Sequence, residues 1–178
     1  MPTNVAARMT LAADPGSLQG AVAAGILGAG PVLLGTAEEC ALLLARAASE
    51  GRGADEIVRE YRKAGRRVPG FGHPVHKPLD PRAERIFELA EERGVAGRHV
   101  AFARELRDEL GLTMNVSLPI AAVLLDLGYE PQAVKAIPIL ARTASLLAHL
   151  AEERERPVGL LLAEAAEESV RYEPDARA

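Results

Sequence analysis

The chain has 178 residues, of which 48% are hydrophobic and only 3% aromatic, and its formal net charge is −4 at pH 7. The charge balance excludes a general basic surface for nucleic acid. The single cysteine, Cys40, excludes both an internal disulfide and a CxxC metal site. We expect Cys40 to be a small buried residue of a cytoplasmic protein.

Alanine and leucine dominate the apolar residues, and both favour helices over strands. No segment alternates with the period of two that strands show, so the sequence predicts an all-α fold. In chain order, helices are expected over about residues 4–11, 18–27, 36–49, 54–63, 81–93, 98–110, 115–127, 132–155 and 159–171.

Short polar residues mark the beginnings of several helices. Thr3 and Ser17 precede the first two helices, and Thr36 with Glu39 has the spacing of a capping box at the third. Asp80, followed by a proline, marks the start of the fifth helix, because its carboxylate can cap and the proline already has a helical φ.

Apolar residues at helical spacing indicate which faces are buried. The expected core-facing residues are Cys40, Leu43 and Leu44 in the third helix, Ile57, Val58 and Tyr61 in the fourth, and Ile86, Leu89 and Ala90 in the fifth. Residues 115–127 are apolar on all sides, which predicts a buried helix. Pro138 is expected to kink the long helix that follows.

The longest uncharged stretch, residues 15–37, has the length of a membrane span. Prolines and glycines interrupt this stretch, and such residues break helices. We therefore interpret it as one short helix and a glycine-rich loop, and we expect no membrane partner.

Residues 69–82 read Pro-Gly-Phe-Gly-His-Pro-Val-His-Lys-Pro-Leu-Asp-Pro-Arg and contain too many prolines for regular structure. His73 and His76 can titrate near neutral pH, and Lys77 and Arg82 can bind an anion. Two other interpretations stay open. The loop could be a rigid connector whose histidines only cap and pack, or the two histidines could bind a metal, although no third ligand is apparent.

Three stretches of the chain carry family-like motifs. Residues 72–82 match G-H-P-V-x-K/R-x-x-D-P-R. Residues 30–38 look like a G-P-x-H-G-G-x-N-E loop, and residues 115–149 look like N-V-D followed by A-R-T-x-x-x-x-A-H. Together these stretches resemble the citrate synthase family, and especially its citryl-CoA lyase-like members.

The resemblance implies a two-lobed helical fold, with large-lobe helices at residues 1–32, a small lobe at 33–116 and C-terminal large-lobe helices at 117–178. It also implies cleavage or formation of a citryl-CoA-type thioester from acetyl-CoA and oxaloacetate. The coenzyme A thioester is then a substrate, and no permanently bound cofactor is expected. Several family helices lie outside this chain, so the apolar residues 115–150 are expected to need either a homodimer partner or an upstream segment.

The resemblance also assigns roles to single residues. His73 matches the histidine that polarises the keto carbonyl, and Arg82 and Arg142 match arginines that bind substrate carboxylates. Lys77 lies where the family has a cation near the coenzyme A phosphates. The alternatives are a packing role for the histidine, salt bridges for the arginines, and a solvated surface for the lysine.

Two positions at which the family has catalytic residues depart from its pattern. Leu33 stands where the family has the histidine that stabilises the enol, and Ser117 stands where it has the catalytic aspartate. Loss of a general base typically costs about 10²–10⁴-fold in rate. The sequence therefore leaves two alternatives open. The chain could bind coenzyme A or a carboxylate without catalysis, or it could be a truncated product that folds poorly.

Overall fold

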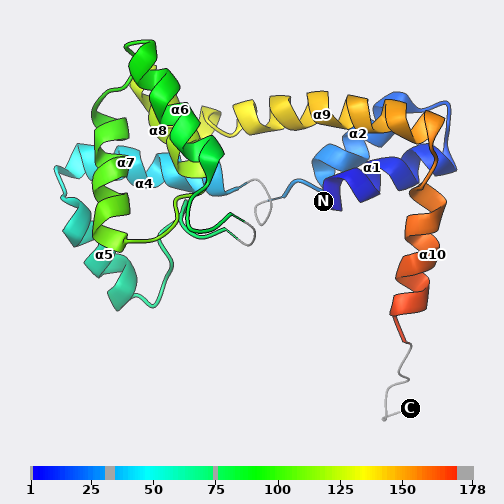
Figure 1. The fold of residues 1–178 in the computed structure, drawn as a ribbon, viewed down its shortest axis with the longest axis horizontal. Coiled ribbons are helices and arrows are strands. Elements are labelled where there is room, and N and C mark those ends of the chain that lie inside the picture. The colour runs from blue at the N-terminus through cyan, green and yellow to red at the C-terminus, as the bar shows by residue number, and fades with distance from the viewer. Residues whose placement is uncertain (1, 31–34, 74–75, 172–178) are drawn as a thin grey trace. The chain divides into compact units, whose positions relative to one another are not determined.

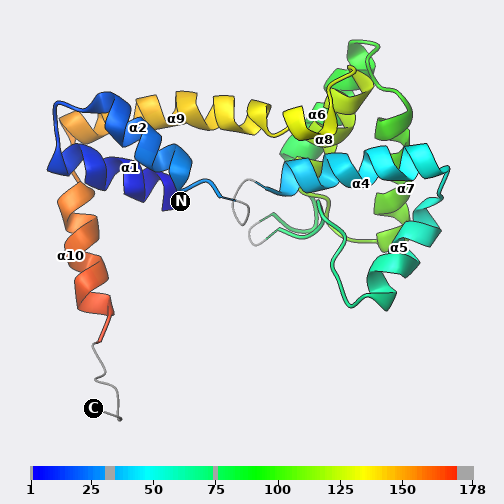
Figure 2. The same cartoon turned by 180° about the vertical axis from the view of Figure 1, so that it is seen from behind.

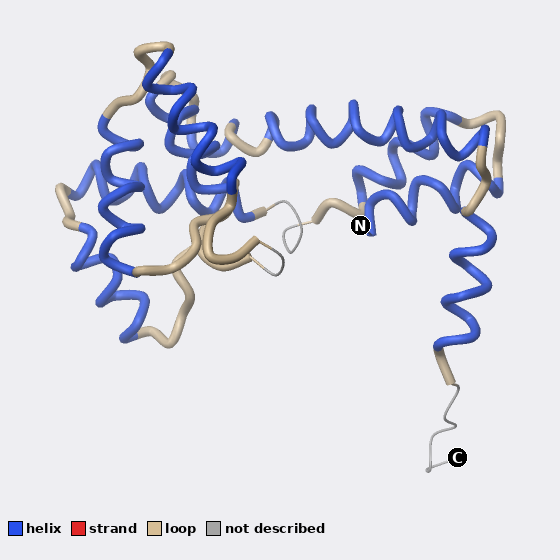
Figure 3. The backbone as a smooth tube through the Cα atoms, viewed as in Figure 1, coloured by secondary structure: helices blue, strands red, loops and turns tan. Residues whose placement is uncertain are grey.

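The computed structural model describes residues 2–30, 35–73 and 76–171. Within these ranges every regular element is helical (Figures 1 and 3). Phe71 and Met114 form an isolated antiparallel bridge. The all-α fold class is confirmed. The helices are α1 (Pro2–Ala13), α2 (Leu18–Leu27), α4 (Thr36–Glu50), α5 (Ala54–Lys63), α6 (Pro81–Glu92), α7 (Arg98–Leu110), α8 (Ser117–Asp126), the 3₁₀ turn η1 (Pro131–Ala133), α9 (Ala136–Glu155) and α10 (Gly159–Ser169).

The chain divides into two compact units. The central unit comprises Pro31–Pro138, and the terminal unit comprises Met1–Gly30 together with Ile139–Ala178. The central unit extends beyond residue 116, where the predicted small lobe ends, because α8 packs against α4, α6 and α7. The assignment of the predicted segments to lobes of the family fold stays a prediction.

The central unit is built around α8, which lies among α4, α6 and α7 in both ribbon views (Figures 1 and 2). This arrangement confirms the burial predicted for the apolar segment. The predicted faces of α4 and α5 are also confirmed, because their apolar residues all belong to the buried cluster of this unit: Cys40, Leu43, Leu44, Ile57, Val58 and Tyr61. Burial raises the pKa of the Cys40 thiol, so this cysteine is an inert core residue.

The predicted core face of α6 is correct at Ala90 and wrong at Leu89. Ala83, Phe87 and Ala90 are buried, whereas Leu89 is 38% exposed and Ile86 is only partly covered. The buried residues follow the i, i+4, i+7 spacing of one helical stripe, and they bring the larger Phe87 ring to the core.

The predicted helix caps are correct at one position and wrong at two. The Asp80 side chain accepts the Arg82 backbone N–H at 3.1 Å, as a capping carboxylate should. Thr3 and Thr36 instead lie inside α1 and α4. Gly35 precedes α4 with helical φ and ψ, so the helix begins one residue earlier than the capping box requires. Ser17 occupies the predicted cap position of α2 but makes no side-chain cap hydrogen bond.

The terminal unit packs α1 against α2 and α10. Its buried apolar cluster consists of Ala7, Leu11, Ala21, Leu146 and Leu150. Arg8 adds a buried ion pair with Glu153, in which Nη1 donates to Oε2 at 2.7 Å. The other Glu153 oxygen accepts the backbone N–H groups at the start of α10, at 2.9 Å from Val158 and 2.7 Å from Gly159. This carboxylate therefore fixes the α9–α10 turn onto α1.

The helix predicted over residues 132–155 is interrupted before Pro138 rather than kinked at it. A 3₁₀ turn and a short connection precede α9, and Pro138 lies in its first turn, where no backbone donor is needed. The stretch Pro131–Glu155 is long and apolar enough to cross a membrane by length and composition alone, and 17% of its apolar window is buried. Leu140 and Leu147 of this helix are 66% and 46% exposed.

Candidate functional site

The loop with the two histidines lies in the central unit and is attached to the segment before α8. The Gly72 N–H donates to the Thr113 carbonyl at 2.7 Å, and the Asn115 N–H donates to the Gly70 carbonyl at 2.9 Å. The Asn115 side chain adds a bond from Nδ2 to the Gly72 carbonyl at 3.2 Å. Three bonds from one short segment therefore fix the backbone immediately before His73.

Gly70 is required by both its conformation and its surroundings. Its φ is +88°, which side chains rarely adopt, and an added Cβ would lie 2.7 Å from the Leu118 Cβ and 2.9 Å from the Cys40 Sγ. Gly72 has a similar φ of +85° but faces open space. The loop backbone thus packs directly on α4 and α8 at one glycine and emerges from them at the other.

The hydrogen bonds of His73 define the orientation of its ring. Its Nδ1 lies 2.9 Å from the His76 backbone nitrogen, whose N–H donates to it. The neutral ring therefore carries its proton on Nε2. Nε2 lies 3.3 Å from Nη2 of Arg82, which is also a donor. Two N–H donors from different parts of the loop thus meet at one place, which suits an oxygen acceptor of a ligand.

Arg82 is held by the buried carboxylate of Asp80. Its Nε donates to Oδ1 at 3.0 Å and its Nη2 donates to Oδ2 at 2.8 Å. Asp80 is fully buried, and these hydrogen bonds, with burial opposing, lower the pKa of its carboxyl to about 2. The guanidinium is half exposed, so the pair presents a fixed cation at the surface of the loop.

The same residues also form a group with metal-ligand chemistry. One ligand atom each from His73, His76 and Asp80 lies within 4.8 Å of the others. The present bonds oppose a metal, because Nδ1 of His73 already accepts an N–H and Arg82 occupies both carboxylate oxygens. The donor pattern therefore favours an anion at this loop.

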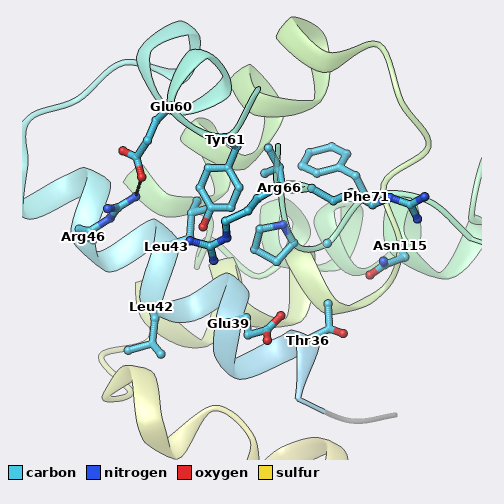
Figure 4. A pocket seen from close by; sticks show the side chains of 14 residues that line it. Thr36, Glu39, Leu42, Leu43, Arg46, Glu60, Tyr61, Arg66, Phe71 and Asn115 are labelled. Atoms are coloured by element: carbon cyan, nitrogen blue, oxygen red, sulfur yellow. Dashed lines mark hydrogen bonds and ion pairs between the residues drawn. The ribbon is translucent and has the colours of Figure 1, made fainter. Parts of the chain in front are cut away.

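A cavity of about 520 Å³ adjoins the histidine loop within the central unit (Figure 4). The residues that line it come from α4, α5, the loop itself and Asn115: Thr36, Glu39, Leu42, Leu43, Arg46, Glu60, Tyr61, Arg66, Arg67, Val68, Pro69, Gly70, Phe71 and Asn115. The guanidinium of Arg66 lies over the Tyr61 ring, with 5.1 Å from its Cζ to the ring centroid. The wall thus combines arginines with aromatic faces.

Two charged side chains of this cavity are already paired. Glu60 accepts from Arg46 at 2.9 Å and also binds Arg52, and these bonds lower the pKa of its carboxyl. Arg66 and Arg67 stand in the cavity wall as additional cations. The cavity can therefore accept a ligand with anionic groups and an aromatic ring.

The structure brings together some of the predicted site residues and separates others by unit. His73 and Arg82 are neighbours, and Lys77 is exposed in the same loop. Arg142 lies on α9 in the terminal unit, and its Nε is buried without a hydrogen-bond partner among the described residues. Ser117 is the first residue of α8, and its N–H donates to Asn115 Oδ1 at 3.0 Å. Leu33 lies outside the described residues.

Sequence reasoning missed the second task of Asp80 and the role of the cavity residues. The spacing D-P-R predicted a cap, but the same carboxylate also holds the Arg82 guanidinium. The sequence predicted Tyr61 only as a core residue. The available signal was the basic pair Arg66 and Arg67, which lies shortly before Gly70.

The matches to known proteins cover most of the chain. Residues 5–160 match the family model described as "Citrate synthase, C-terminal domain". Glyoxysomal citrate synthase of Cucurbita maxima is 33% identical over 137 residues, which cover 70% of this chain and 27% of that protein. The structure of citryl-CoA lyase from Hydrogenobacter thermophilus is similar with a TM-score of 0.82 and 32% identity, covering 86% of this chain and 62% of the other.

A more distant structure supports the fold alone. ATP citrate lyase from Methanothrix soehngenii, in complex with citrate and coenzyme A, has a TM-score of 0.80 at 19% identity, covering 99% of this chain and 32% of the other. The chain spans from 27% to 44% of the length of the curated relatives it matches. Its likeness therefore concerns one part of those larger proteins.

Proposed function

Because the chain belongs to the citrate synthase family, we propose that it binds a citryl-CoA-type thioester and cleaves it to acetyl-CoA and oxaloacetate, or forms it from them. One of its structural neighbours is a citryl-CoA lyase, and several relatives are citrate synthases. The proposal assigns this chemistry to the histidine loop of the central unit.

The observation that carries the proposal is the meeting of two donors at the loop. His73 Nε2 and Arg82 Nη2 lie 3.3 Å apart, and the His76 backbone N–H sets the His73 proton on Nε2. An oxygen of the keto acid placed at hydrogen-bond distance from both nitrogens, to one side of the line that joins them, receives a hydrogen bond from the imidazole and from the guanidinium. Donors fixed in advance polarise a carbonyl without reorganisation cost, and this polarisation is what carbon–carbon cleavage and formation require.

Arg142 is proposed as a second carboxylate ligand. Its Nε is buried and lacks a partner among the described residues. Buried N–H groups without partners are uncommon in native structures, so a substrate carboxylate at this guanidinium would satisfy it.

The cavity beside the loop is proposed to hold coenzyme A. Arg66 and Arg67 supply cations for phosphate oxygens, and Tyr61 and Phe71 supply aromatic surface for a base. Lys77, exposed in the same loop, provides a further cation. The coenzyme A thioester is then substrate rather than a bound cofactor.

The test is cleavage of citryl-CoA by the intact chain, with released oxaloacetate followed through a coupled dehydrogenase. We expect turnover that falls by about 10²–10⁴-fold in His73→Gln, because the variant lacks the polarising imidazole. Arg85→Ala is the control, since Arg85 is exposed on α6 and pairs only with Glu88 and Glu92 among the described residues. An unchanged rate in His73→Gln would refute the catalytic assignment.

A second function follows from Ser117. A serine hydroxyl without an adjacent base is a poor proton acceptor. The hydrogen bond from Ser117 to Asn115 uses the backbone N–H of Ser117 rather than its hydroxyl. In this alternative the chain binds coenzyme A and citrate without turnover. Calorimetric binding of both ligands in the absence of cleavage would favour the alternative.

We also propose that a second copy of the chain covers the apolar surface of the terminal unit, giving a cytoplasmic homodimer. Large apolar side chains are exposed there at high fractions: Leu27 at 83%, Leu140 at 66%, Leu147 at 46%, Leu160 at 71% and Leu161 at 61%. Large exposed apolar surfaces commonly mark protein–protein interfaces. Light scattering of the purified chain should give twice the monomer mass. A monomer that sediments with lipid vesicles would overturn the proposal.

A further inference from the structure

The proposed reaction requires a base, and the family position for it holds Ser117. A thioester methyl group gives up a proton only to a group that can accept it in place, and carboxylates commonly do so. The carboxylates near the histidine loop are therefore the groups to examine.

Two of these carboxylates are poor proton acceptors. Asp80 is held by Arg82 through both oxygens, and its pKa is lowered to about 2. Glu60 is bound by two arginines, and its pKa is also lowered. Each would have to break an ion pair in order to take a proton.

Glu39 differs from both. It lines the cavity from the first turn of α4, and its side chain makes no hydrogen bond or salt bridge within the described part of the chain (Figure 4). Its neighbour Glu38 is instead paired with Lys135 at 3.5 Å. Glu39 is thus the cavity carboxylate whose oxygens are available to a ligand.

The position of Glu39 relates it to the histidine loop. Thr36 and Asn115 line the same cavity, and Asn115 bonds the carbonyl of Gly72, the residue before His73. A thioester whose acyl end lies at Asn115 has the loop on one side and α4 on the other. The cavity therefore places the Glu39 carboxylate in the same wall as Gly70, Phe71 and Asn115, which belong to or bind the backbone that leads to His73.

We propose that Glu39 is the catalytic base that removes a proton from the carbon next to the thioester carbonyl. The C–H bond breaks, its electron pair forms the enolate C=C bond with charge on the thioester oxygen, and the proton moves to a Glu39 oxygen. In the cleavage direction the citryl C–C bond breaks, its electron pair forms the acetyl-CoA enolate, and the citryl hydroxyl loses its proton to water as it becomes the oxaloacetate carbonyl. A protonated Glu39 then gives its proton to the enolate carbon and yields the acetyl-CoA methyl group. The step needs no oxidant or reductant, and it rests on the proposed function because it uses the same acyl-CoA.

The experiment measures exchange of the acetyl-CoA methyl protons with deuterium. The intact chain is incubated with acetyl-CoA in D₂O, with malate in place of oxaloacetate, and methyl deuterium is followed by mass spectrometry. We expect Glu39→Gln to slow exchange by about 10²–10⁴-fold while calorimetric affinity for acetyl-CoA changes little. Glu39→Asp should recover part of the rate, which a purely structural role would not predict.

Glu38→Gln is the matched control, because Glu38 is the adjacent carboxylate of the same helix and is paired with Lys135. It should exchange at the wild-type rate. Exchange at the wild-type rate in Glu39→Gln would overturn the role of Glu39, and the proposed function would stand if citryl-CoA is still cleaved. A wild-type chain that binds acetyl-CoA but exchanges no proton would overturn the base and favour the non-catalytic alternative.

Discussion

The central and terminal units differ in how completely they bury their apolar residues. The central unit encloses α8 with three neighbouring helices and joins residues from five helices into one buried cluster. The terminal unit buries only five apolar residues in its cluster while its helices expose several leucines. A complete core can hold a loop rigidly, so the histidine loop and its cavity belong to the unit that can fix them. The unit with the incomplete core is the one that needs a further surface.

Truncation of Leu146 should cause the largest loss of stability among the changes that test the difference between the two units. It is fully buried in the terminal unit, so Leu146→Ala should cost about 2–5 kcal/mol of the stability of that unit. Arg154→Ala is the control, since Arg154 is exposed on the same helix and its truncation should cost less than about 0.5 kcal/mol. Hydrogen exchange resolves the units, and we expect Leu146→Ala to deprotect α1 and α2 but not α4 or α8. Equal loss of protection in both units would show that they unfold together.

Gly70→Ala should destabilise the central unit by slightly less than Leu146→Ala destabilises the terminal unit. The new Cβ would meet Leu118 and Cys40 below 3.0 Å, and φ is +88°, so we expect about 2–4 kcal/mol of destabilisation. Gly72→Ala shares the positive φ but faces open space, so its cost should be only about 1–2 kcal/mol. Urea unfolding of both variants measures the difference. Equal effects would mean that the loop does not pack tightly on α4 and α8.

Acid should lower the free energy of unfolding of the central unit, and this is the smallest of the three expected losses of stability. The folded pKa of Asp80 is about 2 against an ordinary value of 3.8, so its ionised form is the one that stabilises the fold. The contribution is fully present above about pH 4 and is lost as the pH falls through 2. Because Arg82 is half exposed, we expect only about 1–2 kcal/mol. Urea unfolding at pH 7, 4 and 2.5 should show this loss in the wild type and a flatter profile in Asp80→Asn.

The sequence was most informative where one physical rule decided the outcome. Helical periodicity placed Ile57, Val58 and Tyr61 in the core, and the D-P-R spacing placed the start of α6. Periodicity failed in α6, where either the face with Leu89 or the face with Phe87 could be buried. Only the packing of α6 on α8 decides which face is buried. The same limit applied to the two units, since the boundary at Pro138 depends on which helices α8 contacts.

The candidate site followed the same pattern. The motif predicted His73 and Arg82 as site residues, and the structure places His73 Nε2 and Arg82 Nη2 3.3 Å apart. The sequence did not reveal that the His76 backbone sets the tautomer, or that Asp80 holds Arg82 through both oxygens. Both facts depend on the path of the loop backbone, which several bonds from residues 113–115 determine across a long separation in sequence.

Calorimetric titration of citrate into the intact chain tests the central claim most directly, namely that the histidine loop is a carboxylate site. We expect measurable binding that weakens by at least about tenfold in Arg82→Ala, because a charge-assisted hydrogen bond contributes about 1.5–3 kcal/mol. Arg85→Ala, on the exposed side of the same helix, should bind citrate like the wild type. Equal citrate affinity in Arg82→Ala and the wild type would contradict the account.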